Sequence, residues 1–267
     1  MRIARGISVS NTSKPISTAI VYDADAAAFF TAASITDNTQ KSAVNQLVLS
    51  LKSANIWTKM KALYPVVGGV ASAHAINLKT PGTYNLTFQT GWTHSSTGMT
   101  PNGATYASSA LVPSSVLVQN SSHVSYYSRT NNTGLYDFGH DWTSQTSLIY
   151  LLSRYSDSKS YYRVNAQNTG GTESSQTLAD SLGLFTVNRN SASAQDLFKN
   201  TTKYTFNVNS FGLPSNSIIL GGIFSGTFYG GSRQCAFASI GDGLTDAEAS
   251  SFYTAVQNYQ TTLGRQV

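Results

Sequence analysis

The spacing of apolar residues predicts helices in the first quarter of the chain. Over residues 36–53, apolar side chains recur at i, i+3, i+4 and i+7, which indicates a helix with one apolar face. That face consists of Val44, Leu47, Val48 and Leu51. A shorter helix is predicted over 26–33, with Asp23 or Asp25 as its cap. Similar spacing over 56–63 predicts a third helical piece, which ends at Tyr64 because the residue before a proline resists the helical conformation.

From residue 68 onward, short runs of alternating character replace the helical pattern. They recur about every ten residues and are separated by clusters of Gly, Asn, Ser and Pro. Regular short strands with turn signals between them indicate an antiparallel sandwich or barrel. The runs lie at 84–88, 124–129, 135–139, 147–152, 161–165, 182–188, 204–207, 217–223 and 234–240.

A capping box predicts one more helix at the end of the chain. The Thr245 side chain can accept a hydrogen bond from the amide of Glu248, whose carboxylate can reach back to the amide of Thr245. An apolar stripe follows, and Gly264 ends the helix. The stripe consists of Phe252, Val256, Tyr259 and Leu263.

The composition narrows the chemistry that the chain can perform. Charged residues make up 11% of the chain, against roughly 25% in an ordinary soluble protein, so the surface is neutral and rich in hydroxyl and amide groups. Only 12 residues are acidic, which leaves few candidates for a site with several carboxylates. The net charge of +5 is spread along the chain, so we expect no nucleic-acid partner.

Cysteine content and hydropathy restrict the setting further. The single Cys235 rules out an intrachain disulfide and a cysteine-based zinc cluster, and we expect it to be buried as a small apolar side chain. The most apolar stretch, 18–33, is interrupted by Asp23 and Asp25 and is shorter than the roughly 20 residues that a membrane-spanning helix needs. We therefore predict no signal peptide and no membrane segment.

Several motifs in the second part of the chain follow a familiar order. An early strand at 84–88 leads through a Gly/Asn loop into residues 102–107, and a central strand reads His-x-Ser-x-Tyr-Ser-Arg from His123 to Arg129. A closing strand reaches Gly241, and residues 243–248 then open the last helix. This order, over 77–263, resembles the laminin-G-like, concanavalin A-like jelly rolls.

A second resemblance covers the beginning and the end of the chain. Residues 23–69, with the stretch Ile56-Trp57-Thr58-Lys59-Met60, and the terminal Leu263-Gly264-Arg265 look like an arrangement in tailed-bacteriophage virion proteins. In those proteins a helical lead-in precedes the same jelly roll. The resemblance implies a virion surface component, assembled in the host cytoplasm, such as a capsid decoration, a head fibre or a tail protein.

These patterns together predict a mainly β protein. We expect a concanavalin A-like antiparallel β-sandwich jelly roll with an N-terminal helical segment and a C-terminal helix. Residues 1–64 would form an N-terminal arm and helical attachment segment, and residues 65–267 the laminin-G-like sandwich with its C-terminal helix. The apolar faces of the helical segment would pack on the sandwich or on another copy, so we expect a homo-oligomer in contact with other virion proteins.

The acidic residues argue against catalysis. A concanavalin A-like fold hosts both lectins and glucan hydrolases, so the residues must decide between them. Retaining hydrolysis needs two carboxylates about 5 Å apart, and the chain has no Glu-x-Asp-x-x-Glu strand. Glu173 lies in a Gly/Ser loop and Glu248 is the helix cap. We predict a structural, non-enzymatic protein that binds a host surface glycan or neighbouring subunits; a glycoside hydrolase and a purely structural capsid protein remain the alternatives.

Carbohydrate binding would use exposed aromatic rings that stack on sugars and polar groups that bind hydroxyls. The candidates near polar loops are Trp92, His94, Asp141 and Trp142. Either tryptophan could instead pack over the rim of the sandwich. The tyrosine pairs 126–127 and 161–162 would each turn one ring outward, because neighbouring side chains of a strand point to opposite faces.

Calcium is the one ion that the resemblance suggests, because laminin-G-like relatives often hold it on their loops with a carboxylate and backbone oxygens. The candidate ligands are Asp137, Asp141 and Asp157. Acids at such positions also cap turns, so we expect no cofactor and leave calcium open.

Overall fold

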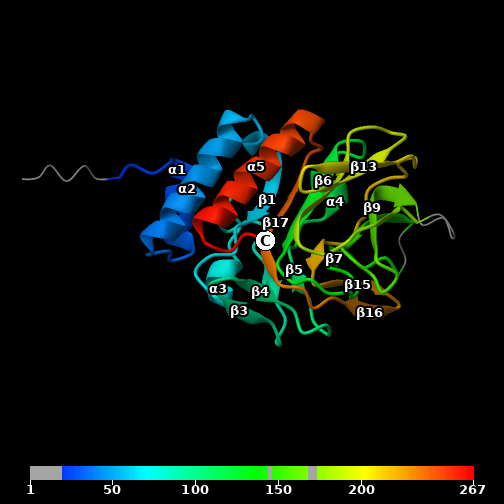
Figure 1. Cartoon of the computed structure of the whole chain (residues 1–267), viewed down its shortest axis with the longest axis horizontal. Coiled ribbons are helices and arrows are strands. Elements are labelled where there is room, and N and C mark those ends of the chain that lie inside the picture. Colours follow the sequence, from blue (N-terminus) through cyan, green and yellow to red (C-terminus); the bar gives the residue numbers. More distant parts are fainter. Residues whose placement is uncertain (1–19, 144–145, 168–172) are drawn as a thin grey trace, which may run out of the picture.

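A computed structural model describes residues 20–143, 146–167 and 173–267 of the protein. These residues form three layers. A helical layer lies against one antiparallel sheet, and a second antiparallel sheet lies on the other side of the first (Figure 1). The prediction of a mainly β sandwich with a C-terminal helix is confirmed. The expected arm at 1–17 lies outside the described residues.

The sheet next to the helices, called sheet A here, has the order β13-β12-β11-β6-β17-β4-β3, and β1 also pairs with β17. All of its pairings are antiparallel. Its strands are β1 (Met60–Tyr64), β3 (Thr93–Ser95), β4 (Gly98–Thr100), β6 (Ser122–Ser128), β11 (Gly183–Arg189), β12 (Gln195–Lys199), β13 (Thr202–Phe206) and β17 (Cys235–Gly241).

The outer sheet, called sheet B here, has the order β10-β9-β8-β7-β14-β5-β2. Its strands are β2 (Thr87–Phe88), β5 (Ala107–Ser108), β7 (Phe138–Gly139), β8 (Ser147–Leu152), β9 (Lys159–Gln167), β10 (Ser175–Thr177) and β14 (Ile219–Leu220). A separate hairpin is formed by β15 (Gly222–Ser225) and β16 (Thr227–Gly230). Short helical turns, η1 (Trp57–Lys59), α3 (Ala71–His74) and α4 (Pro113–Val116), connect the strands.

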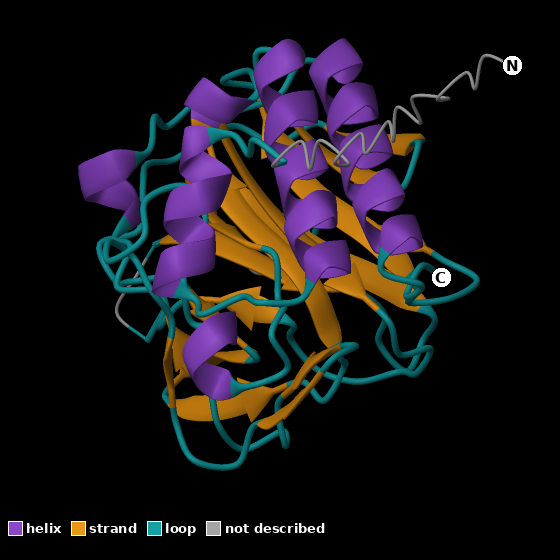
Figure 2. Cartoon of the chain, turned by 90° about the vertical axis from the view of Figure 1, so that its left-hand side faces the viewer, coloured by secondary structure: helices purple, strands orange, loops and turns teal. Residues whose placement is uncertain are grey.

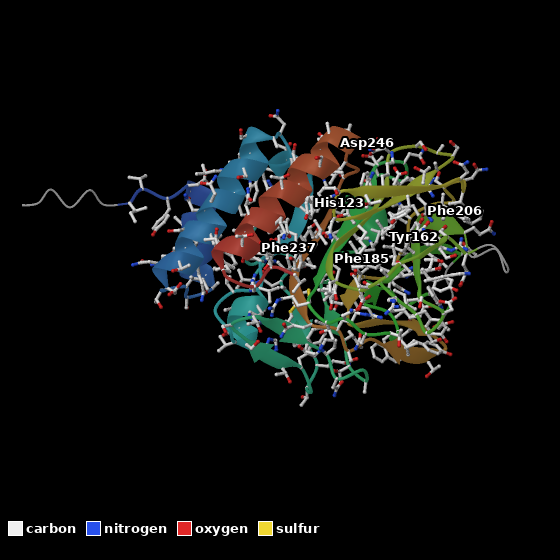
Figure 3. The ribbon with its side chains drawn as sticks, viewed as in Figure 1. His123, Tyr162, Phe185, Phe206, Phe237 and Asp246 are labelled. Carbon is white, nitrogen blue, oxygen red and sulfur yellow. The ribbon has the colours of Figure 1, made fainter. Side chains whose placement is uncertain are left out.

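The main core lies between the two sheets and follows the alternation of side chains along each strand. In β8, Ile149 and Leu151 face this core. Tyr162 of sheet B and Phe185 of sheet A, both labelled in Figure 3, belong to the same core. The side chains that alternate with these on sheet B face the other way, and they form the surface described in the next section.

Three longer helices cover the outer face of sheet A (Figure 2). Helices α1 (Ala24–Ala32) and α2 (Asn38–Ser53) are capped by Asp23 and Asp37. Helix α5 (Asp246–Thr262) begins with the predicted capping box of Thr245 and Glu248. These three helix predictions are confirmed. In the described part of the chain, no helix combines the length and the apolar character needed to cross a bilayer.

The apolar faces of the helices are buried within the chain itself. Val44, Leu47 and Leu51 of α2 share one core with Phe237 of β17 and Phe252 of α5. The helical segment therefore packs on the sandwich of its own chain. This removes the reason for which self-association was expected.

The prediction of a helix over 56–63 is wrong. Only the single turn η1 is helical, and β1 then pairs with β17, with Tyr64 opposite Ala238. Met60 packs under the helices, whereas Ala62 faces the core between the sheets. The last residues of the segment 1–64 are thus a strand of sheet A.

The expectation for the tyrosine pair 126–127 is also wrong, because both rings are buried. They do point to opposite faces of β6. Tyr126 lies in the core between the sheets, and Tyr127 lies under the helical layer, where its hydroxyl donates to Gln257. The helices cover the face that would otherwise meet water. The pair 161–162 behaves as expected, with Tyr162 buried and Tyr161 partly exposed.

A fully buried ion pair joins the two sheets near the candidate site. Arg233, just before β17, donates to both carboxylate oxygens of Asp137, just before β7, at 2.9 and 3.1 Å, and neither side chain is exposed to solvent. The Ser153 amide donates to the same carboxylate at 2.7 Å. Arg233 also donates to the backbone carbonyls of Leu135 and Arg154.

We expect Asp137→Asn to lower the free energy of unfolding by about 3–5 kcal/mol, because the buried guanidinium then loses its counter-charge. Urea unfolding measures this change. The matched control is Lys203→Gln, which breaks the partly exposed pairs with Asp246 and Asp196 and should cost no more than about 1 kcal/mol. Equal losses in the two variants would contradict the structural importance of the buried pair.

Candidate functional site

Two pockets open on the face of sheet B that points away from sheet A. This face carries Leu148, Tyr150 and Tyr161, which alternate with residues of the main core. In β5 and β14, Ser108 and Ile219 point to the same side, since their neighbours Ala107 and Leu220 belong to the main core.

The β15–β16 hairpin lies over this face and contributes to both pockets. Ile223 sits fully buried beside Gly139 of β7, where a side chain at residue 139 would collide with it. Ile223 pairs with Tyr229, and Phe224 pairs with Phe228, so the two pairs point to opposite faces of the hairpin. Tyr229 lines one pocket and Phe224 lines the other.

The pocket that Tyr229 lines, called the tyrosine pocket here, has a volume of about 300 Å³. Aromatic and aliphatic side chains form its walls, and one carboxylate lies among them. The lining residues are Leu135, Tyr136, Leu152, Tyr155, Tyr161, Glu173 and Tyr229. Tyr155 and Tyr229 are 41% and 39% exposed, so their rings are open to a ligand.

The tyrosine rings are held by neighbouring aromatic groups. Tyr155 and Tyr161 stand at 81° to each other, with their ring centres 6.2 Å apart. Tyr136 packs edge to face against Trp142 and Tyr150 at 5.5 and 5.4 Å. Perpendicular rings of this kind give the pocket a fixed shape without filling it.

Hydrogen bonding, burial and charge raise the pKa values of two phenols of the pocket, those of Tyr161 and Tyr136. The Tyr161 hydroxyl donates to Asp157 at 2.5 Å, and this bond, with burial and the nearby carboxylate of Glu173, raises the Tyr161 pKa to about 12. Burial raises the pKa of Tyr136, and Glu173 adds to that effect. The lining therefore offers the neutral hydroxyl groups of Tyr136 and Tyr161 and a single acid, Glu173.

The pocket that Phe224 lines, called the polar pocket here, has a volume of about 310 Å³. It is lined by Tyr106, Ser108, Asp141, Asn216, Ser217, Ile219 and Phe224. The Asp141 carboxylate accepts hydrogen bonds from the amide and the hydroxyl of Thr143 at 2.9 and 2.7 Å, which lower its pKa. Asn216 donates to the Asp141 carbonyl, so this polar group is also engaged.

The four residues predicted to bind carbohydrate do not form one site. Trp92 packs edge to face on Phe88 at 5.2 Å. His94 contacts the same ring at 4.6 Å, and its Nδ1 lies 2.9 Å from Nδ1 of His74. Trp92 and His94 line neither pocket.

The other two predicted residues lie next to the pockets. Asp141 lines the polar pocket. Trp142 supports the tyrosine pocket from behind, through its contact with Tyr136, and also packs on Tyr150 at 5.1 Å. Both tryptophans thus pack on other aromatic rings, the alternative considered from the sequence.

The three aspartates considered for calcium each have another role. Asp137 pairs with Arg233, Asp141 caps the turn at Thr143, and Asp157 accepts from Tyr161. Across residues 20–143, 146–167 and 173–267, no group of three or more His, Cys, Asp or Glu side chains is placed to hold a metal ion. The structure gives the calcium hypothesis no cluster of ligands there.

The sequence analysis missed the tyrosines as a group. Tyr136, Tyr155, Tyr161 and Tyr229 come from four separate segments, and only the 161–162 pair indicated an outward ring. The predicted pattern placed one strand at 217–223 and did not include the hairpin that carries Tyr229. Its tip, Gly226, has a positive φ of 74°, so the Ser-Gly-Thr turn at 225–227 was the available signal.

Comparisons by sequence find no matching family model and no matching curated protein. The structure is similar to a botulinum neurotoxin serotype D binding domain, with a TM-score of 0.51 and 10% identity over 75% of this chain and 52% of that one. A mutant Trypanosoma rangeli sialidase displaying trans-sialidase activity also gives 0.51, with 8% identity over 82% and 39% of the two chains.

A third similarity is to domain 4 of a GH43 extracellular arabinanase from Geobacillus stearothermophilus, in complex with arabinotriose. Its TM-score is 0.45, with 12% identity over 73% of this chain and 98% of that domain. The chain spans about half of the toxin structure and about two fifths of the sialidase structure. Likenesses at such low identity establish the β-sandwich fold alone. None of these three structures is a virion protein.

Burial of histidines predicts a pH dependence of stability. It lowers the pKa of His74 to about 3, and those of His123 and His140 to about 4. The unfolded chain takes up protons below pH 6.5 and the folded chain does not, so stability is full above pH 6.5 and falls as the pH drops toward 4. Each histidine contributes at most about 1.4 kcal/mol per pH unit.

Urea unfolding between pH 7 and 4.5 tests this expectation. His123→Gln removes one of the groups and should reduce the slope of the free energy of unfolding against pH by about one proton. A stability that stays constant over this range would show that these histidines are protonated in the folded state as well.

Proposed function

We propose that this chain is a non-enzymatic carbohydrate-binding protein whose tyrosine pocket is the primary site. The observation that carries the proposal is the group of four tyrosines beside Glu173 on an exposed sheet face. Aromatic faces stack on the apolar faces of sugars, and hydroxyl and carboxylate groups bind their hydroxyls.

The size and position of the pockets support a short oligosaccharide as the ligand. A volume of about 300 Å³ is at the lower end of small-molecule sites and suits one or two sugar units. The polar pocket lies on the other side of the hairpin, with Tyr106 and Phe224 at 5.4 Å and an amide at Asn216. A longer chain would extend from one pocket to the other along the hairpin.

The carboxylates support binding without hydrolysis. Glu248 is held by the helix cap and by Lys59 at 2.6 Å. Glu173 is the one carboxylate that lines the tyrosine pocket, and Asp157 is bound to Tyr161. The common retaining and inverting mechanisms use two carboxylates that flank one glycosidic bond.

We further propose, from the sequence resemblance, that the chain works as a surface component of a virion. The two segments that carry this resemblance are one structural unit. The Arg265 guanidinium, buried at the C-terminal end, donates to the carbonyls of Pro65 and Val66 at 2.9 and 2.7 Å. The Tyr259 hydroxyl donates to the Pro65 carbonyl at 2.7 Å. These contacts support an attachment side on the helical layer, opposite the proposed glycan-binding face.

The tyrosine pocket is tested by a glycan array followed by titration calorimetry with the best neutral oligosaccharide. Tyr155→Ala and Tyr229→Ala should each weaken binding about tenfold, because each removes one exposed stacking ring. The control is Phe211→Ala, which removes a ring of similar exposure (49%) that lines neither pocket, and should bind like the unchanged protein.

Two results would contradict the proposal. Absence of binding to every glycan at millimolar concentration would leave the chain as a purely structural protein. Release of new reducing ends from a polysaccharide, abolished in Glu173→Gln, would establish the glycoside hydrolase alternative.

A further inference from the structure

We infer that the tyrosine pocket selects a glycan that carries a protonated amine, such as an amino sugar without its acetyl group. This inference rests on the proposed carbohydrate binding and specifies the ligand class. Its basis is a pocket lined by four tyrosines, two of them nearly perpendicular, and by one carboxylate with no ion pair among the described residues.

Four tyrosines line the pocket from separate segments of the chain. Tyr155 and Tyr161 meet at 81°, and Tyr136 and Tyr229 line the same pocket. The faces of such rings carry a negative potential that attracts an ammonium group within about 6 Å of the ring centre. A neutral sugar needs one stacking ring, whereas a cage of several rings is the arrangement that recognises a cation.

The charges around the pocket favour a cation as well. The chain carries a net charge of +5, but the pocket lining includes Glu173 and no Lys or Arg. No ion pair to Glu173 is found among the described residues, so its charge is available to a ligand. A carboxylate near an ammonium ion in a partly enclosed site strengthens the attraction of the rings.

Two basic residues, Lys159 and Arg163, flank Tyr161 on the same face of β9. Lys159 lies near Asp157, whose pKa its charge helps to lower. Arg163 is fully buried and donates to the Gln167 carbonyl and to the Tyr150 hydroxyl. Neither lines the pocket.

The polar pocket provides an internal comparison. It also contains one acid, Asp141, but both donors of Thr143 bind that carboxylate. Both bonds end on one oxygen of that carboxylate, Oδ1. The polar pocket is lined by two aromatic residues, Tyr106 and Phe224, against four tyrosines in the tyrosine pocket. The amine preference is therefore assigned to the tyrosine pocket.

The test compares two ligands that differ only in the amine: the β-1,4-linked trimer of glucosamine and the same trimer in its N-acetylated form. Calorimetry at pH 6 and low salt should give about tenfold tighter binding of the glucosamine trimer. In Glu173→Gln this preference should fall from tenfold to threefold or less, so that the two Kd values differ by about half a log unit at most. The control is Asp246→Asn, an exposed acid at the start of α5 (Figure 3), which should keep the preference.

The outcomes separate this inference from the proposed function. Equal binding of the two trimers, or a preference that Glu173→Gln leaves intact, overturns the amine selectivity and leaves carbohydrate binding standing. Failure of both trimers together with every other glycan overturns the proposed function itself. Loss of the preference in Asp246→Asn as well would show a general effect of net charge and would also overturn the inference.

Discussion

The buried pair of Asp137 and Arg233 is the interaction on which the rest of the structure depends. It joins the start of β7 in sheet B to the start of β17 in sheet A with no exposure to water. The Asp137 carbonyl also accepts the amide of Gly221, immediately before the hairpin. Since Tyr136 precedes Asp137 in the chain, one wall of the tyrosine pocket and the base of the hairpin share the same anchor. Removing either partner would leave the other charge buried and unpaired, which is far more costly than losing an exposed pair.

The scarcity of acids shapes how the other cations are buried. Arg189 and Arg265 are almost fully buried and bind backbone carbonyls in place of carboxylates. Arg189 donates to the carbonyls of Val164, Ser191, Ala194 and Val208, and Arg265 to those of Pro65, Val66 and Ala236. Burial without a carboxylate partner lowers the Arg189 pKa to about 10. Each arginine thereby holds segments that are distant in sequence without using one of the few acids of the chain.

The elements that could be predicted from the sequence are those whose signals are local. Helices α1, α2 and α5 have a cap and an apolar face within one segment, so their patterns identified them. Strand β1 has apolar residues on both faces, because the helices cover one side and the sandwich the other. A strand buried on both faces loses its alternation and cannot be told from a helix by spacing alone. The burial of Tyr127 has the same cause.

The candidate site depends on contacts that no local pattern contains. The sequence indicated a site with aromatic rings beside polar groups. Both pockets have such a lining, but of the four predicted residues only Asp141 belongs to it. Trp92 and Trp142 pack against Phe88 and Tyr136 and are half-buried. Tyr155 and Tyr229 are more exposed and keep a polar hydroxyl at the edge of the ring, so they are the rings open to a ligand. Tyr229 reaches the pocket only because Gly139 lets the hairpin approach β7. The absence of a side chain at Gly139 thus decides where the ring of Tyr229, 90 residues further along the chain, is placed.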